Sequence, residues 1–140
     1  MTCACAPRLE LKHGHMNFAV LEFELKGLTD QIAHIREVAI KNLEPLFKLF
    51  GEAWFSEYIL PTVTEASRRT GPASYLGRIT SLQSIGILSS HISPGLLQEL
   101  IPQIAVPLVS DKVVNVRIAA AEALVKCGDR LGDKSEHPLV

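Results

Sequence analysis

One pattern of residues occurs twice in this chain, and the two copies are 81 positions apart. In each copy an aspartate is followed six residues later by an arginine, which comes directly after a β-branched residue and is followed by alanine and leucine. The first copy starts at Asp30 and has Arg36, and the second starts at Asp111 and has Arg117. A pattern that recurs along a chain indicates a repeated structural unit.

A weaker third copy lies between these two, with Arg78 in the arginine position and Pro72 where the aspartate would stand. The three arginines are thus 42 and 39 residues apart. A period of about 40 residues is the length of one helix–turn–helix unit of the HEAT type. Such units stack into surfaces that bind other proteins. The pattern therefore predicts an all-α fold, an α-α superhelix (a HEAT-repeat, armadillo-like solenoid) of about three helix pairs.

Apolar residues at steps of three and four predict six helices. Their expected ranges are 16–28, 32–50, 54–69, 74–91, 94–109 and 113–127. Paired in order, they give a repeat domain over 16–128, with units at about 16–51, 54–91 and 94–128. Residues 1–15 and 129–140 lack this period, and we expect a flexible N-terminus and a flexible tail. Three prolines inside helices, Pro45, Pro61 and Pro102, should bend them, and the last two occupy matching places.

Composition excludes several classes of function. The net charge is −1, so the chain lacks the concentrated basic surface that nucleic-acid binding needs. No apolar run is long enough to span a bilayer, and polar residues interrupt the first 15 positions, so we expect neither a membrane segment nor a signal peptide. Three cysteines, an odd number, fit a reducing compartment. We expect a cytoplasmic or nuclear protein without cofactors.

The repeated aspartate and arginine residues have a structural interpretation. Their spacing puts a carboxylate in the turn between two helices and a guanidinium one turn into the second helix. Adjacent turns could then be joined by charge-assisted hydrogen bonds. We therefore assign Asp30, Arg36 and Arg117 to a structural ladder, which Pro72 interrupts at the middle repeat.

Several motifs, taken together and in this order, are similar to one family. They are Ile35-Arg36-Glu37-Val38-Ala39, Lys48-Leu49-Phe50-Gly51-Glu52-Ala53-Trp54, Ile59-Leu60-Pro61, Tyr75-Leu76-Gly77-Arg78, Leu100-Ile101-Pro102 and Asn115-Val116-Arg117. Over about residues 17–130, the chain resembles the C-terminal repeats of the HEAT-repeat scaffold, a regulatory subunit of protein phosphatase 2A.

This resemblance implies a non-catalytic scaffold that binds the phosphatase catalytic subunit, with further regulatory subunits held by the longer array. In the family, the turns between paired helices hold the catalytic subunit. The residues carried over to that role are Gly71, Pro72, Ser74, Tyr75, Leu76 and Arg78 in one turn, and Asp111, Lys112, Val113, Val114 and Asn115 in the next. The corresponding first turn contains Asp30, Gln31 and His34.

Two other interpretations remain open. A HEAT-type adaptor for transport or assembly would have the same architecture and a different partner. An enzyme or metal protein would use the four potential zinc ligands Cys3, Cys5, His13 and His15, but their spacings are not those of common structural zinc sites, so we expect no metal. The outermost helices keep apolar residues that a polar cap would lack, and we expect weak self-association through Phe18, Leu21, Leu25, Ile118 and Leu124.

Overall fold

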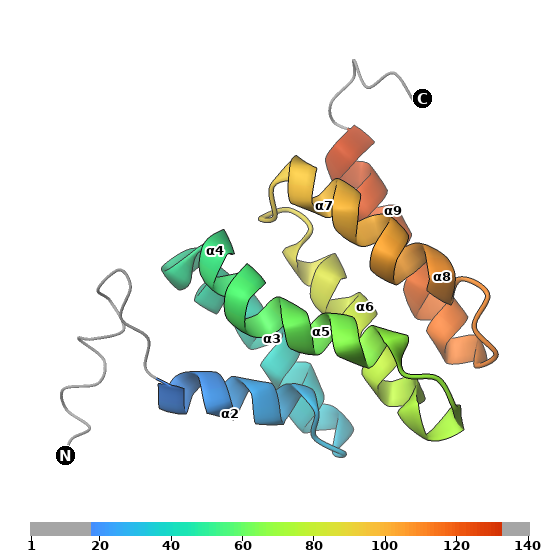
Figure 1. Cartoon of the computed structure of the whole chain (residues 1–140), viewed down its shortest axis with the longest axis horizontal. Coiled ribbons are helices and arrows are strands. Elements are labelled where there is room, and N and C mark those ends of the chain that lie inside the picture. The colour runs from blue at the N-terminus through green and yellow to red at the C-terminus, as the bar shows by residue number, and fades with distance from the viewer. Residues whose placement is uncertain (1–17, 133–140) are drawn as a thin grey trace. The chain divides into compact units, whose positions relative to one another are not determined.

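A computed structural model describes residues 18–132 of the chain, and within this range every regular element is a helix (Figure 1). The α-helices are α2 (Phe18–Leu28), α3 (Ala33–Phe50), α4 (Glu52–Trp54), α5 (Leu60–Arg68), α6 (Tyr75–Leu88), α7 (Pro94–Leu100), α8 (Val106–Leu108) and α9 (Val114–Gly132). Two π-helical segments, η2 (Phe55–Ile59) and η4 (Ile101–Ala105), join α4 to α5 and α7 to α8, and a 3-10 turn, η3 (Pro72–Ser74), precedes α6. The all-α prediction is confirmed.

The helices begin and end close to the expected residues, with one larger difference. Helix α9 continues through Gly128 to Gly132, so residues 129–132, expected in the flexible tail, are helical. A glycine inside a helix costs only about 1 kcal/mol relative to alanine, which does not by itself end a helix.

The π-helical segments occur where prolines interrupt a helix. A proline ring collides with the carbonyl four residues earlier, and a widened turn relieves this contact. The carbonyl four residues before Pro61 belongs to η2, and the one before Pro107 belongs to η4. By this criterion Pro107 corresponds to Pro61. Pro102, which the sequence interpretation matched with Pro61, instead lies inside η4.

The described chain divides into two compact units, one ending at Pro61 and the other beginning at Thr62. In the first unit, α2 and α3 fold back on each other through a short turn and bury Leu28, Leu43 and Phe47. Phe55 of η2 completes this core, with its ring centroid 5.4 Å from that of Phe47.

Small residues let α2 and α3 approach closely. A Cβ atom placed on Gly27 would lie 2.9 Å from the Cβ of Ala39, a separation that real Cβ atoms essentially never show. Ala39 is therefore small because Gly27 of its own helix pair contacts it.

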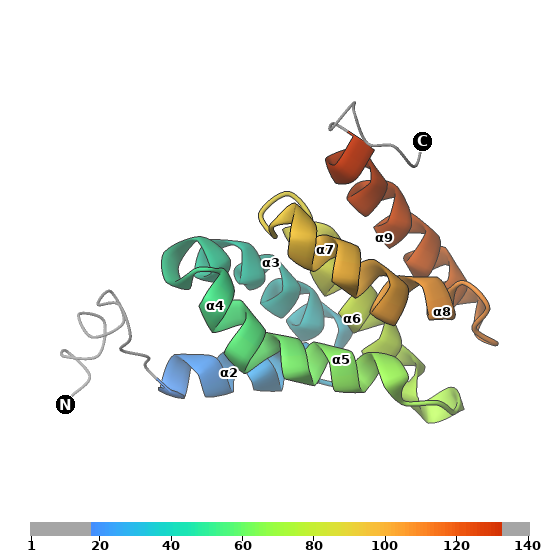
Figure 2. The ribbon, with the colours of Figure 1, turned by 45° about the horizontal axis from the view of Figure 1, so that its top comes forward.

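The second unit is built around α6, which packs against α9 and buries Leu82, Ile85 and Leu88 (Figure 2). Four hydroxyl side chains of the α6 segment are buried as well, and each donates a hydrogen bond to a backbone carbonyl: Thr80, Ser81, Ser84 and Ser89. Ser81 reaches the carbonyl of Val63 in α5 at 2.8 Å, so α6 is covered from this side too. Helix α9 also contacts α7 and α8.

Replacing Gly27 with alanine should destabilise the fold by about 1–3 kcal/mol, because the added methyl group would collide with Ala39. Gly128 is the matched control, since a Cβ there meets open space within α9. Gly128→Ala should instead stabilise by up to about 1 kcal/mol through helix propensity. Urea unfolding of both variants measures the difference, and equal effects at the two positions would contradict the close approach.

Candidate functional site

The residues expected to contact a partner lie in two turns of the second unit and at the start of the helices that follow these turns, α6 and α9. The first connects α5 to α6 and includes Gly71, whose φ of +103° belongs to the region that favours glycine. The second connects α8 to α9 and contains Asp111 and Lys112. Both are short and carry little regular structure of their own, as is usual for segments that present binding residues.

Arg78 binds the backbone of the first turn. Its Nη1 donates hydrogen bonds to the carbonyl oxygen of Arg69 at 2.6 Å and to that of Gly71 at 3.1 Å. These bonds satisfy two carbonyls where the chain leaves α5 and has no helical partners for them. The guanidinium thus fixes the path of the first turn from its position on α6.

The same arginine reaches the second turn. Its Nη2 donates to Oδ1 of Asp111 at 3.1 Å, and its Nε lies 2.6 Å from Oδ2. Only 5% of the Arg78 side chain and 9% of the Asp111 side chain are exposed. One buried ion pair therefore joins the two turns, and they lie side by side.

The Asp111 carboxyl keeps its charge despite this burial. Loss of water favours the neutral form, but the hydrogen bond from Arg78, the bond from the Val113 amide and the charges of Arg78 and Arg117 outweigh it. Together they hold the pKa of Asp111 below its ordinary value of 3.8.

The first and last copies of the sequence pattern have matching local geometry. Asp30 accepts a hydrogen bond from the amide of Ile32 through Oδ1, and Asp111 accepts one from Val113 in the same way. Six residues after each aspartate, an arginine Nη1 donates to that aspartate's own carbonyl oxygen, at 2.7 Å for Arg36 and 2.8 Å for Arg117.

The expected ladder residues therefore bind within their own turns, and the bond between turns is made by Arg78. Arg117 is exposed and also donates to the Lys112 carbonyl. It acts on the ion pair through its charge, which lowers the pKa of Asp111.

The expected contact residues differ in exposure. Those open to solvent are Gly71, Lys112, Val114 and Asn115, and those half-buried are Ser74, Tyr75, Leu76 and Val113. Pro72 forms part of η3. Arg78 is buried and engaged within the chain, so its role in this structure is to hold the turns rather than to touch a partner. The surface left for a partner combines Tyr75, Lys112, Val114 and Asn115.

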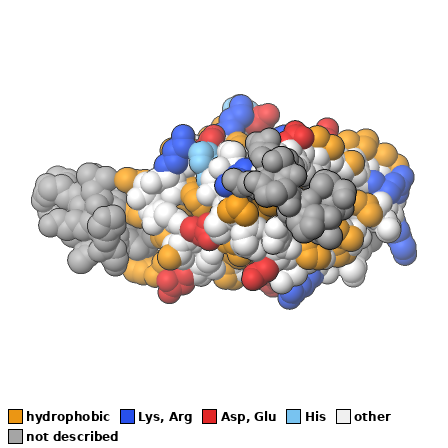
Figure 3. Space-filling model, turned by 90° about the horizontal axis from the view of Figure 1, so that it is seen from above, with side chains coloured by type: hydrophobic (Ala, Val, Ile, Leu, Met, Phe, Trp, Pro, Cys, Tyr) orange, Lys and Arg blue, Asp and Glu red, His pale blue; other side chains and the backbone are white. Residues whose placement is uncertain are grey.

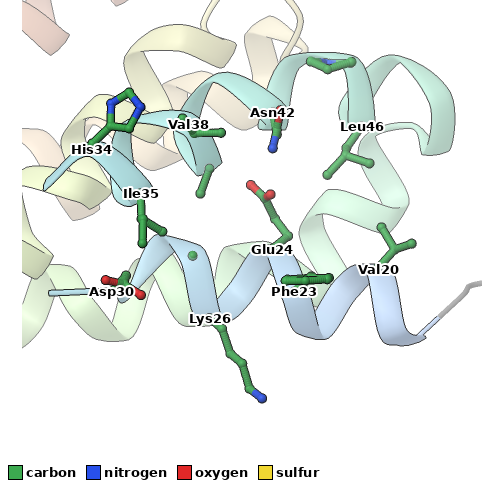
Figure 4. A pocket seen from close by; sticks show the side chains of 13 residues that line it. Val20, Phe23, Glu24, Lys26, Asp30, His34, Ile35, Val38, Asn42 and Leu46 are labelled. Atoms are coloured by element: carbon green, nitrogen blue, oxygen red, sulfur yellow. The ribbon is translucent and has the colours of Figure 1, made fainter. Parts of the chain in front are cut away.

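A groove in the first unit has no counterpart in the sequence interpretation (Figure 4). It has a volume of about 770 Å³ and lies between α2 and α3. Its walls are mostly apolar and include Phe23, which is 80% exposed, together with Ile35 and Val38. Exposed apolar surface that is also concave is typical of a binding site.

Glu24 points into this groove toward Asn42 (Figure 4). The residue is only 5% exposed, and its Oε2 has no hydrogen-bond partner among the described residues. Burial raises the pKa of the Glu24 carboxyl from 4.5 to about 7. A sequence signal existed, because Glu24 lies three residues after Leu21 and four before Leu28, on the apolar stripe of α2.

Other candidate residues have structural roles or lie outside the described range. Trp54 is buried and stacks on Phe50 with ring centroids 5.1 Å apart. Cys127 is buried, which raises the pKa of its thiol to about 11 and makes it a poor nucleophile. The possible zinc ligands between Cys3 and His15 lie outside the described residues, and residues 18–132 contain no metal-binding cluster of three or more His, Cys, Asp or Glu.

The surface and the helix lengths add two observations. On the face seen in Figure 3, acidic and basic side chains are interspersed among hydrophobic ones, as expected for a net charge of −1. No helix in the described part of the chain is long and apolar enough to cross a membrane.

Comparison of the chain with protein-family models, with curated proteins and with solved structures finds no match.

Proposed function

We propose that this chain is a non-catalytic scaffold of the HEAT type, whose helix pairs form an α-α superhelix and whose turns bind the catalytic subunit of a serine/threonine protein phosphatase 2A. The family in this proposal is inferred from the sequence resemblance. The proposed binding surface is formed at two turns of the second unit, residues 69–74 and 109–113, which we call the paired turns.

The observation that carries the proposal is the buried Arg78–Asp111 pair. An ion pair removed from water is costly unless its geometry satisfies both groups. Here Nη1 of the guanidinium also donates to the carbonyls of Arg69 and Gly71. A chain that only needed a packed core could use apolar residues at these positions, whereas this network fixes the shape of two solvent-facing turns.

The exposed surface at the paired turns suits a protein partner. Tyr75 is half-buried and offers a large, rigid side chain whose hydroxyl can hydrogen-bond at an interface. Lys112 adds a positive charge at the rim, and Val114 adds apolar surface that is 54% exposed. Aromatic, apolar and charged groups are the usual composition of an interface centre and its rim.

The test measures binding of the purified phosphatase catalytic subunit to the chain by biolayer interferometry. The double variant Tyr75→Ala with Lys112→Glu should bind at least about tenfold more weakly, because it removes an aromatic anchor and reverses a rim charge. Circular dichroism should show unchanged helix content, since neither residue is fully buried.

Lys126→Glu is the matched control, because it makes the same charge reversal on an exposed residue of α9 that is distant in sequence from the paired turns. It should leave the affinity within about twofold. If Lys126→Glu loses binding and the double variant does not, the catalytic subunit contacts the chain somewhere other than the paired turns. If the parent chain shows no binding to the catalytic subunit, the phosphatase proposal fails and an adaptor for another protein partner replaces it.

A further inference from the structure

The groove between α2 and α3 is formed by one face of each helix (Figure 4). The residues in its wall recur at steps of three and four, which places them on the same side of a helix. They include Phe23 and Gly27 on α2 and Ile35, Val38, Asn42 and Leu46 on α3. From Ile35 to Leu46 the wall extends along about 16 Å of α3. A concave surface of this length between two helix faces suits a third helix, whose side chains fit between theirs.

The wall exposes apolar side chains to solvent. Phe23, Ile35 and Val38 are all exposed, and Phe23 is the most exposed of the large hydrophobic residues in the described range. Apolar side chains gathered on a concave surface are usually covered by a partner. An amphipathic helix covers them with apolar residues of its own, spaced by three and four.

A buried carboxylate lies among these apolar residues. Glu24 is 5% exposed and points into the groove, and its Oε2 has no hydrogen-bond partner among the described residues. The other charged or titratable residues of the wall are Lys26 and His34, which are exposed, and Asp30, which is half-buried. Lys26 pairs with Glu22 at 3.2 Å. A wholly apolar occupant would remove the remaining water from Glu24 and leave its charge without compensation.

The second unit shows how this chain accommodates a buried carboxylate. The Asp111 side chain is 9% exposed, and it receives Nε and Nη2 of Arg78, which belongs to α6. A guanidinium is a planar fork of donors that matches the geometry of a carboxylate. Glu24 is buried to a comparable degree and has no such group among the described residues. The element that fills the groove should therefore supply one.

We propose that the groove binds an amphipathic helix of a partner protein, which packs apolar side chains on Phe23, Ile35 and Val38 and pairs an arginine from its apolar face with Glu24. The arginine neutralises the carboxylate and also selects among helices, since a helix without it leaves a buried charge unpaired. The site lies in the first unit, so this proposal is independent of the partner assigned to the paired turns.

Binding should be stronger at pH 8 than at pH 6. Burial raises the pKa of the Glu24 carboxyl to about 7 in the free chain, and an arginine beside it favours the charged form. The affinity should therefore fall by about tenfold as the pH drops from 8 to 6. Glu24→Gln should remove this difference. The other titratable groups that face the groove or contact α2, which are Lys26, Asp30, His34 and Tyr58, remain in this variant, so a persisting difference would belong to them and contradict the pairing with Glu24.

The test measures binding of a labelled helical peptide to the full chain by fluorescence anisotropy. The designed peptide has about 15 residues, a face of leucines with one arginine at its centre, and alanine and glutamine elsewhere. A second peptide differs only by norleucine in place of the arginine, which keeps an unbranched side chain without the charge. At pH 8 the arginine peptide should bind at least about tenfold more tightly than the norleucine peptide. Equal affinities, or no binding of the arginine peptide, would overturn the proposal.

Variants of the chain locate the contact. Glu24→Gln keeps the size of the side chain without its charge, and it should bring the affinities of the two peptides to within about threefold of each other. Phe23→Ser should weaken binding of both peptides about tenfold or more, because an apolar contact is lost. Leu49→Ser is the matched control, since Leu49 is an exposed apolar residue of α3 outside the groove, and it should bind like the parent.

Because Phe23 and Leu49 are exposed, circular dichroism should show unchanged helix content in both serine variants. If Leu49→Ser weakened binding as much as Phe23→Ser, the groove would not be the site. If Glu24→Gln kept the parent's preference for the arginine peptide, Glu24 would not be the group that recognises the arginine.

Sedimentation velocity without peptide tests whether a second copy of the chain occupies the groove instead. Of the residues that we expected to promote self-association, Phe18 and Ile118 are exposed, Leu25 and Leu124 are half-buried, and Leu21 is buried. None of the five belongs to the groove wall. Any self-association should therefore persist in Phe23→Ser, whereas its loss in this variant would identify a second copy as the occupant and overturn the proposal.

Discussion

Arg78→Ala should lower the free energy of unfolding by about 3–5 kcal/mol. This is the usual cost of removing one partner of a buried ion pair, because the other charge stays buried without compensation. Here Asp111 would be that charge, and the carbonyls of Arg69 and Gly71 would lose their donors as well. Chemical denaturation at pH 7, followed by circular dichroism, measures the effect.

Two further variants make this prediction specific. Arg117→Ala removes an exposed arginine that binds the carbonyls of its own turn, and it should cost less than about 1 kcal/mol. The double variant Arg78→Met with Asp111→Leu removes both charges and should recover most of the stability lost in Arg78→Ala. If Arg117→Ala were the more damaging single change, Arg117 rather than Arg78 would be the arginine that joins the turns.

Acid should reduce the difference in the free energy of unfolding between the parent and Arg78→Ala. The pKa of Asp111 lies below 3.8 in the folded chain, so its contribution to stability is present above that value. The contribution is lost as the pH falls through the folded pKa, where the carboxyl becomes neutral in both states. Denaturation of the parent and the variant between pH 2 and pH 5 tests this trend.

Glu24→Gln should stabilise the protein by about 2–3 kcal/mol at pH 8. The pKa of this carboxyl is raised from 4.5 to about 7 by burial, and each pKa unit corresponds to about 1.4 kcal/mol. Since the folded pKa is above the unfolded one, the favourable contribution is complete below pH 4.5 and is lost as the pH rises through 7. The parent should therefore become less stable across this range, and the difference from Glu24→Gln should grow with pH.

Glu22→Gln is the control for this prediction. Glu22 lies two residues earlier on α2, is 67% exposed and pairs with Lys26 at 3.2 Å. Its substitution should change stability by less than about 1 kcal/mol. A pH profile of Glu24→Gln that parallels the parent's would show that the carboxyl is solvated in solution.

The sequence predicted the helices well because their apolar stripes and glycine or proline boundaries are local signals. It also identified the aspartates and arginines that organise two of the turns, since a spacing of six residues fixes their geometry within one turn. The partner of Arg78 was harder to infer. Asp111 lies 33 residues away, and which turns become neighbours depends on how the helices pack.

Burial on more than one side was the other feature that periodicity did not reveal. Ser81 and Ser84 of α6 are buried and bonded to carbonyls, because α5 and α9 both pack on this helix. Glu24 was overlooked for a different reason, which is that it is a charged residue among apolar ones. It stands on an apolar stripe, and only the unfilled groove beside it explains how a carboxyl can remain there.

The Arg78–Asp111 pair has a consequence for the thermodynamics of recognition. Two loops that move independently must be ordered when a partner touches both, and the lost conformational entropy weakens the affinity. Loops already tied together by a buried guanidinium are ordered before the encounter. Arg78 would thus strengthen binding to the paired turns without contacting the partner, and its loss would appear in calorimetry as a less favourable binding entropy at nearly unchanged contact area.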